Sequence, residues 1–278
     1  MTKRLLALHE LCLENSGKSL AERLQVLSEF FLETLYGFWP DGSSFESLDD
    51  FAYTLDTLDC VTFVEVALAL AKTEPLPDFA EFAQEFENIL RLIHYANGRP
   101  NFVSRNHFMS VDWILNNKFI VEDITSSLSD NAKMAEALID KLTWIKRHKI
   151  NKNTSDLPES VLKKFQPQIS RLPYIETNEL LAEPGRFQQS FPDYSIVNIV
   201  RPNWDLTEKI GTHLNVSHLG FTFKDPLSQQ LSFYHASNDD RMKVVKDTLY
   251  GYMERFKDSP TIKGINVLII TPGYHHAR

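Results

Sequence analysis

The chain has 278 residues, 43% of them hydrophobic, and its nineteen Phe and four Trp are enough to build a substantial core. A formal net charge of -8 argues against a nucleic-acid-binding protein, because neutralising phosphates needs a basic patch and the densest basic run, WIKRHKINK at 144–152, is short. Two cysteines are too few for a disulfide framework or a four-thiolate zinc site.

The spacing of apolar residues in the first part of the chain is typical of helices. Five segments are predicted to be helical, at residues 19–38, 60–72, 78–96, 108–117 and 131–148. The first is expected to end near Tyr36, and the second, apolar on nearly every side, to be buried and capped by Asp59 or Thr57. Asn-Gly and Arg-Pro pairs mark residues 95–107 as a loop.

The last third changes to strand-like segments. Four short runs rich in β-branched and aromatic residues lie at 194–202, 216–223, 230–237 and 264–272. Helices first and strands last predict an α+β fold with an antiparallel sheet, in a single domain spanning residues 1–278. The polar, proline-containing residues 149–192 are expected to form an irregular excursion within that domain.

Neither a membrane span nor a leader is evident. No segment reaches the roughly 18 to 20 uninterrupted apolar residues of a transmembrane helix. The N-terminal apolar run does not have the form of a signal peptide, since His9 and Glu10 interrupt it. These features predict either a cytoplasmic protein or a chain whose leader has been removed.

Two histidines lie on adjacent predicted strands. Strand alternation puts His218 on the face opposite Leu219. If the connecting residues 224–230 form a symmetric turn, His218 and His235 are direct cross-strand neighbours, with Cβ atoms about 4.5–5.5 Å apart. A slip of one residue would move the two imidazoles to opposite faces.

Such a pair of imidazoles can be a metal site, a catalytic base with the group that orients it, or two unrelated polar residues. A zinc site needs three or four ligands, and no third His, Asp or Glu stands at a suitable spacing on this hairpin. His275 and His276 near the C-terminus have no defined relation to it. The sequence therefore favours the other two interpretations over the metal site.

Cys60 stands at the predicted start of the buried helix. The helix dipole and free N–H groups favour a thiolate there and can lower the pKa of a cysteine to roughly 3.5–7.5. A nucleophile partnered by His218 is one interpretation, and a small core residue is the other. Cys12, on an amphipathic helix, is expected to be structural, so Cys60 is expected to react faster with alkylating reagents.

Several motifs occur together in one order: LDCVTFVEVALALA, SRNHFMSVDWI, VSHLGF, and YHAS followed by KVV and LYGYM. With these motifs the chain resembles the N-acetylmuramoyl-L-alanine amidase-like family of the NlpC-type cell-wall cysteine hydrolases, which have a papain-like fold. The resemblance runs from about Phe31 to the C-terminal strand. The resemblance implies that Cys60 is the nucleophile, His218 the base and His235 the residue that orients the base.

The resemblance also implies further site residues. Tyr36 would line the site, and Arg105 and His107 would lie near the substrate. A structural ion pair is the alternative for Arg105, and a structural role is the alternative for His107. Asp59 is expected to cap the helix rather than to act as a catalytic acid.

The implied reaction is hydrolysis of the amide between the lactyl group of N-acetylmuramic acid, or its 1,6-anhydro form, and L-alanine in peptidoglycan fragments, with no metal or cofactor. The alternatives are an NlpC-type γ-D-glutamyl-diamino acid endopeptidase and a non-catalytic muropeptide-binding protein. The expected partners are muropeptides, with no nucleic acid and no stable membrane insertion, and the expected state is a monomer. A periplasmic or exported location is implied, with the cytoplasm as the alternative.

Overall fold

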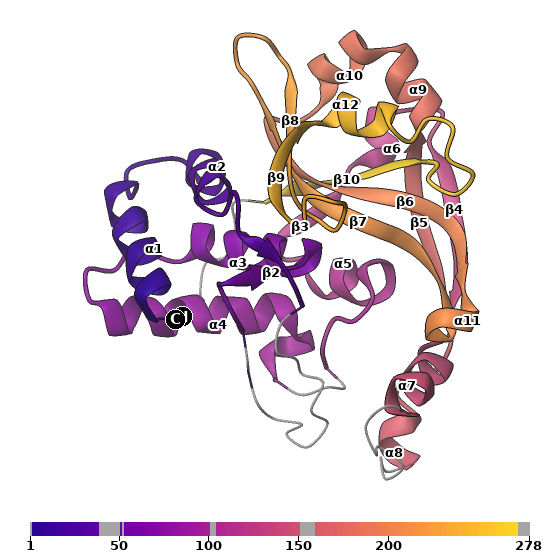
Figure 1. Cartoon of the computed structure of the whole chain (residues 1–278), viewed down its shortest axis with the longest axis horizontal. Helices are drawn as coiled ribbons and strands as arrows, with labels where there is room; N and C mark the ends of the chain where they lie inside the picture. The colour runs from indigo at the N-terminus through magenta and orange to yellow at the C-terminus, as the bar shows by residue number, and fades with distance from the viewer. Residues whose placement is uncertain (1, 39–50, 52, 101–103, 151–158, 272–278) are drawn as a thin grey trace.

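The computed structural model describes residues 2–38, 51, 53–100, 104–150 and 159–271. The fold is mixed α/β: helices from the first part of the chain lie beside a large curved sheet (Figure 1). The helices of this group are α1 (Thr2–Glu14), α2 (Leu20–Phe30), α3 (Cys60–Lys72) and α4 (Phe79–His94).

Within the described residues the sheet has ten strands. Nine of them follow the order β2-β1-β9-β8-β7-β6-β10-β5-β4, and the tenth, β3, pairs with β10 outside this order. Its described pairings are antiparallel, except that β1 and β2 run parallel. The strands are β1 (Leu35–Tyr36), β2 (Thr57–Leu58), β3 (Val121–Asp123), β4 (Lys133–Ile139), β5 (Gln168–Glu176), β6 (Tyr194–Leu206), β7 (Thr212–Lys224), β8 (Leu231–Ser237), β9 (Lys243–Thr248) and β10 (Gly264–Ile270).

Shorter helical segments connect these elements. They are η1 (Ala96–Gly98), the π-helical turn η2 (Met109–Trp113), α5 (Ile114–Asn116), α6 (Thr125–Leu128), α7 (Lys141–Ile150), α8 (Glu159–Leu162), α9 (Thr177–Ala182), α10 (Pro184–Ser190), α11 (Thr207–Ile210) and α12 (Leu249–Glu254). In Figure 1, α9, α10 and α12 lie together at one end of the sheet, away from α1 to α4.

Two large apolar clusters cover the two faces of the sheet. Leu219 and Phe221 from β7 pack in the first cluster with α1 to α4. Ile199 from β6 and Phe233 from β8 pack in the second with α9, α10 and α12. Strand alternation therefore divides the apolar residues between the faces as the sequence predicts.

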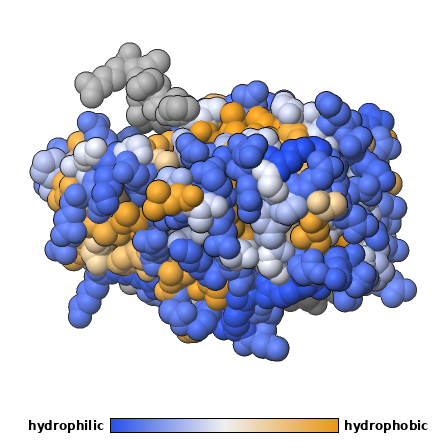
Figure 2. Space-filling model, turned by 90° about the horizontal axis from the view of Figure 1, so that it is seen from above, coloured by the Kyte–Doolittle hydropathy of each residue, from blue (hydrophilic) through white to orange (hydrophobic). Residues whose placement is uncertain are grey.

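The face of the molecule drawn in Figure 2 carries mainly polar residues. Figure 2 shows one face as mostly hydrophilic, with separate small hydrophobic patches. Within the described residues, the helices are too short or too polar to cross a bilayer.

Several predicted elements are confirmed. Helix α3 starts and ends as predicted, and α4 lies within the predicted 78–96. The predicted helix at 108–117 is a π-helical turn followed by one short α-helical turn. All four predicted strands are present as β6, β7, β8 and β10.

The predicted helix at 19–38 ends too late. Helix α2 stops at Phe30, and Glu33 then takes a positive φ of 68°, which turns the chain. Tyr36 consequently lies in β1, where its N–H donates to the carbonyl of Met242 at 2.8 Å. The apolar residues after Phe30 belong partly to a strand rather than to another helical turn. A prediction from helical spacing alone therefore makes the helix too long.

The predicted helix at 131–148 is wrong in its first half, which forms strand β4. Ala135, Ala137 and Ile139 are buried while Met134 and Leu138 are exposed. Strand β4 pairs with β5 on one side and carries apolar residues on both faces. The two-residue period of a strand is therefore not visible in its sequence. Helix α7 begins only at Lys141.

The irregular excursion predicted for 149–192 is also wrong over its described part. It contains β5, α9 and α10. Ser170, Leu172 and Tyr174 are buried, while Arg171 between them is exposed. Pro173 falls inside this strand, and its presence is what made the segment look like a loop.

Candidate active site

The first turn of α3 is fixed by its cap. The Asp59 carboxylate accepts hydrogen bonds from the N–H groups of Val61 and Thr62 at 2.9 and 2.8 Å. The Thr62 hydroxyl in turn accepts from the Asp59 N–H at 2.9 Å. This reciprocal cap confirms the predicted role of Asp59 and makes Cys60 the first residue of a buried helix.

The Cys60 thiol is protonated at rest. Burial, with a smaller contribution from the Asp59 carboxylate, raises its pKa to about 12, although the N–H groups of Leu219, Cys60 and Val61 act to lower it. The lowered pKa predicted from the helix start is therefore wrong for the unliganded site, because loss of water outweighs the backbone donors.

A protonated thiol has a distinct pH signature. We expect the rate of Cys60 alkylation by iodoacetamide to rise about tenfold per pH unit from about pH 6 to 9, in proportion to the thiolate fraction. Peptide mass spectrometry separates Cys60 from the buried Cys12, whose pKa burial raises to about 11. A rate independent of pH over this range, and lost in His218→Ala, would instead reveal a preformed thiolate–imidazolium pair.

Strands β7 and β8 bring His218 and His235 together in a register two residues from the predicted one. Phe221 pairs with Tyr234, so Gly220 rather than His218 stands opposite His235. The imidazoles meet along the diagonal, with Nε2 of His218 2.8 Å from Nδ1 of His235 and the rings nearly perpendicular at 88°. A two-residue shift keeps both side chains on one face, so the predicted pairing of the imidazoles survives.

Gly220 permits this diagonal contact. A Cβ at this position would lie 2.3 Å from the carbonyl oxygen of Tyr234 and 2.8 Å from Cβ of His235. Any side chain there would displace the strand or the His235 ring. The glycine between the two histidines thus leaves the space in which the imidazoles meet.

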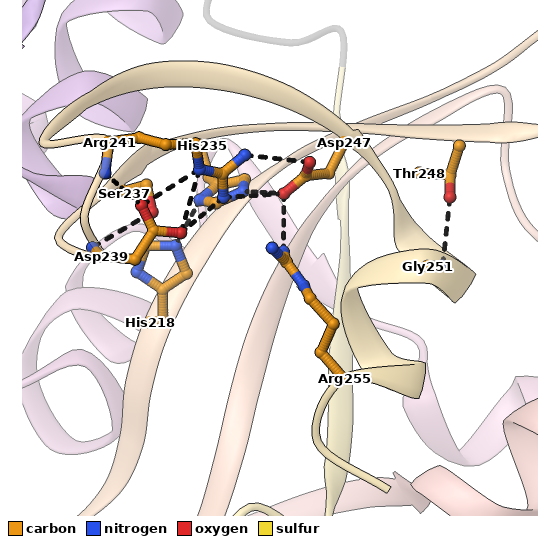
Figure 3. Close-up of polar contacts among 9 residues, drawn as sticks. All are labelled: His218, His235, Ser237, Asp239, Arg241, Asp247, Thr248, Gly251 and Arg255. Atoms are coloured by element: carbon orange, nitrogen blue, oxygen red, sulfur yellow. Dashed lines mark hydrogen bonds and ion pairs between the residues drawn. The ribbon is translucent and has the colours of Figure 1, made fainter.

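The hydrogen-bond chain continues from His235 to Asp247 on β9 (Figure 3). Nε2 of His235 lies 3.1 Å from Oδ2 of Asp247. Arg241 donates to both carboxylate oxygens at 3.0 and 3.1 Å, and Arg255 donates to Oδ2 at 2.7 Å. The His235 hydrogen bond and these two arginines hold the pKa of Asp247 well below its usual range.

The ionised Asp247 determines the tautomers along this chain. Because the carboxylate can only accept, the Nε2 of His235 carries the proton and its Nδ1 accepts. The Nε2 of His218 must then donate to that Nδ1, which leaves a lone pair on Nδ1 of His218. His218 is thereby held as a base at Nδ1, the nitrogen not used by the histidine pair.

Both imidazoles are neutral at neutral pH. Burial, reinforced by the neighbouring His235, lowers the pKa of His218 to about 3. Burial also lowers the pKa of His235, although the hydrogen bond to Asp247 opposes that shift. A neutral His218 is ready to accept a proton, which is what a general base for a protonated thiol requires.

Two tyrosines lie near the Cys60 thiol. Burial, and the nearby Cys60 and Asp59, raise the pKa of Tyr36, so its hydroxyl remains a hydrogen-bond donor. Burial also raises the pKa of Tyr252 on α12, and the Cys60 thiol adds to that shift. The Tyr252 ring stacks on His218, with centroids 5.9 Å apart. Cys60, Tyr36, Tyr252 and His218 thus belong to one site.

Arg105 and His107 contact other aromatic residues of the chain. Arg105 forms an isolated antiparallel bridge with Tyr95. The His107 ring lies 4.7 Å from that of Trp144, which packs on the small cluster around Phe108. These contacts do not test the substrate roles of the two residues, which stay predictions.

The described residues hold no group of three His, Cys, Asp or Glu side chains suited to a metal ion.

Sequence reasoning missed Asp247 and Tyr252. Asp247 lies in KVVKDT, a short polar strand without a clear two-residue period. Tyr252 lies in LYGYM, which was part of the family pattern but carried no assigned role. Asp247 stands two residues before LYGYM in the sequence, and this position was the signal that could have pointed to it.

These groups are those that an amide hydrolase with a nucleophile needs: a thiol, a base held in one tautomer and an orienting chain. A family model described as AmiA-like, N-acetylmuramoyl-L-alanine amidase-like, matches residues 26–262. The chain belongs to this amidase-like family. No curated protein matches the chain significantly.

Solved structures share the fold. A protein from Legionella pneumophila is 29% identical, with 98% of this chain and 95% of that one covered and a TM-score of 0.81. An N-acetylmuramoyl-L-alanine amidase from Bacteroides uniformis is 22% identical, with coverage of 91% and 99% and a TM-score of 0.59. A putative xylanase from Bacteroides fragilis is 26% identical, with coverage of 87% and 98% and a TM-score of 0.59.

Proposed function

We propose that the protein is a cysteine amidase that hydrolyses the amide between the lactyl group of N-acetylmuramic acid, in its ordinary or 1,6-anhydro form, and L-alanine in peptidoglycan fragments. The observation that carries the proposal is the hydrogen-bonded chain from His218 through His235 to Asp247 in a member of the amidase-like family. The name of the Bacteroides uniformis neighbour agrees with it.

The acylation step follows from the protonation states. Nδ1 of His218 takes the Cys60 proton as Sγ attacks the lactyl carbonyl carbon. The oxyanion is stabilised by the Cys60 N–H at the helix start and by the Tyr36 hydroxyl, which stays protonated. The imidazolium then gives its proton to the nitrogen of L-alanine, the amide bond breaks, and a thioester remains on Cys60.

Deacylation reverses these roles. Nδ1 of His218 takes a proton from water, which attacks the thioester carbon. The second tetrahedral intermediate collapses, Sγ leaves and recovers the proton, and the lactyl carboxylate is released. His235 and Asp247 keep His218 in the same tautomer through both halves.

The proposal extends to the architecture. Residues 1–278 would form one papain-like, NlpC-type domain that acts as a monomer on soluble muropeptides. Such substrates favour a periplasmic or exported protein.

The identity of the released fragment tests the reaction. Digestion of an anhydro-muropeptide is expected to yield an intact peptide with a free L-alanine amino terminus and an unsubstituted muramic sugar, detected by mass spectrometry. Recovery of L-Ala-D-Glu still attached to the sugar would mean cleavage at the γ-D-glutamyl link and favour the endopeptidase alternative. Binding without any fragment would favour a muropeptide-binding protein.

A further inference from the structure

Strand β6 bulges close to the cross-strand partner of His218. Ile199 pairs with His218, but after the next pair the ladder resumes only at Trp204. Residues 201–203 thus leave the ladder, and Asn203 takes a positive φ of 49°. Bulges re-aim side chains and are common beside active sites. Arg201 is the first residue of this bulge.

Arg201 is a half-buried cation with no ion pair to a carboxylate among the residues that the structure describes. Its guanidinium lies over the Trp204 ring at 4.2 Å. Its Nε is buried and has no hydrogen-bond partner within the described residues. Burial lowers the pKa of Arg201, and the contribution that opposes this shift comes from the Tyr252 phenol rather than from a carboxylate.

The neighbouring arginines behave differently. Arg241 binds Asp239 and Asp247, and Arg255 binds Asp247. Both are therefore neutralised inside the protein. A partly desolvated cation that lacks such a partner gains from an anion that reaches it, because the contact with the Trp204 ring replaces only part of the lost hydration.

Tyr252 connects Arg201 with the candidate active site. The Cys60 thiol raises the pKa of the Tyr252 phenol, and the Arg201 guanidinium lowers it. Its ring also stacks on His218. Arg201 and the Cys60 thiol are therefore both near the Tyr252 phenol, beside the candidate active site.

We propose that Arg201, supported by Trp204, binds the free α-carboxylate of the second stem-peptide residue, the γ-linked D-glutamate. This inference deepens the proposed function and rests on it, since it assumes that the peptide begins at the scissile amide. A planar guanidinium that keeps its terminal N–H groups available suits a carboxylate, which it can bind through two parallel hydrogen bonds.

The reach of the peptide fits this assignment. An extended chain advances at most about 3.3–3.6 Å per residue, so a carboxylate two residues beyond the scissile carbonyl lies about 7 Å away. Along β6, two residues separate Arg201 from the partner of His218, a spacing of about 7 Å before the bulge shortens it. The two spans agree.

Two synthetic muropeptides test the proposal. Both carry L-Ala-γ-D-Glu-L-Lys on the muramic sugar, and in one the glutamate α-carboxylate is replaced by a carboxamide. We expect the wild type to favour the carboxylate form about 10- to 100-fold in kcat/KM, mainly through KM, as the loss of a charged hydrogen bond implies. Arg201→Gln should cleave the two probes with equal kcat/KM.

The controls separate this inference from the reaction itself. Arg171→Gln removes an exposed arginine paired with Glu136 and should keep the preference. Equal cleavage of the two probes by the wild type, or a preference unchanged in Arg201→Gln, would overturn the inference and leave the amidase intact. Calorimetry with Cys60→Ala tests binding alone: an Arg201-dependent preference there, without cleavage by the wild type, would support the carboxylate site while the proposed reaction fails.

Discussion

Replacing Cys60 by alanine is expected to lower kcat/KM for muropeptide hydrolysis by about 10⁴- to 10⁶-fold, as removal of a nucleophile does in hydrolytic triads. His218→Ala should have a loss of the same order. In the proposed mechanism the thiol is protonated at rest, so it would depend on His218 to remove its proton during attack.

This dependence makes the two losses non-additive. The double variant should be no less active than either single variant, because a thiol without its base and a base without its thiol are equally unable to acylate. His235→Ala should retain more activity, since a water can bind Nε2 of His218 in the vacated space. Rates from product release in the presence of excess enzyme would give all four values.

The second cysteine provides the matched control. Cys12 is buried in α1, in the cluster that contains Leu8 and Leu24, and it makes no contribution to the site. Cys12→Ala should therefore keep full activity even if it melts at a lower temperature. Substantial hydrolysis by Cys60→Ala would end the nucleophile assignment, because no bound thioester could then form.

Local patterns predicted the backbone around Cys60 well. Asp59 and the apolar run after Cys60 specify a capped, buried helix within a few residues of each other. The two-residue period of β7 and β8 likewise fixed which faces carry His218 and His235.

Non-local pairing was the part that the sequence could not supply. The turn between β7 and β8 closes over six residues, where the Asp225 N–H donates to the Gln230 carbonyl and the Gln229 N–H donates to that of Asp225. That loop centres the hairpin one position later than a symmetric turn over Pro226 and Leu227. Register therefore depends on turn geometry, whereas the face of each side chain depends only on parity.

Asp247 was missed for a related reason. Its strand is short and polar, and its position beside β8 follows from sheet order rather than from any local period. The same holds for β1, which pairs with β9 and brings Tyr36 toward Cys60. Contacts set by strand order become visible only in the folded chain.

Replacing Asp247 by alanine is expected to lower kcat/KM by about 10²- to 10⁴-fold through a change of tautomer, the upper value being that of the orienting aspartate in serine proteases. Without the carboxylate, Nε2 of His235 faces the donors of Arg241 and Arg255. It would then accept, its Nδ1 would carry the proton, and His218 would be left protonated at Nδ1, where the base is needed.

The variant Asp247→Asn keeps a hydrogen-bond acceptor at this position but removes the negative charge, so it separates the effects of the two. Three donors converge on Oδ2, from His235, Arg241 and Arg255, whereas Oδ1 receives only one, from Arg241. The asparagine carbonyl should therefore occupy the Oδ2 position and preserve the tautomers. We expect a loss of only about tenfold, since the hydrogen bond remains and the charge is removed.

Nitrogen-15 NMR of the histidines reports the tautomers directly. In the wild type and in Asp247→Asn, Nδ1 of His218 should have the shift of an unprotonated ring nitrogen, and in Asp247→Ala that of a protonated one. Asp239→Ala is the control, because it also takes a carboxylate from Arg241 but does not touch His235. An unprotonated Nδ1 of His218 in Asp247→Ala, together with a large loss of activity, would show that Asp247 acts through charge alone.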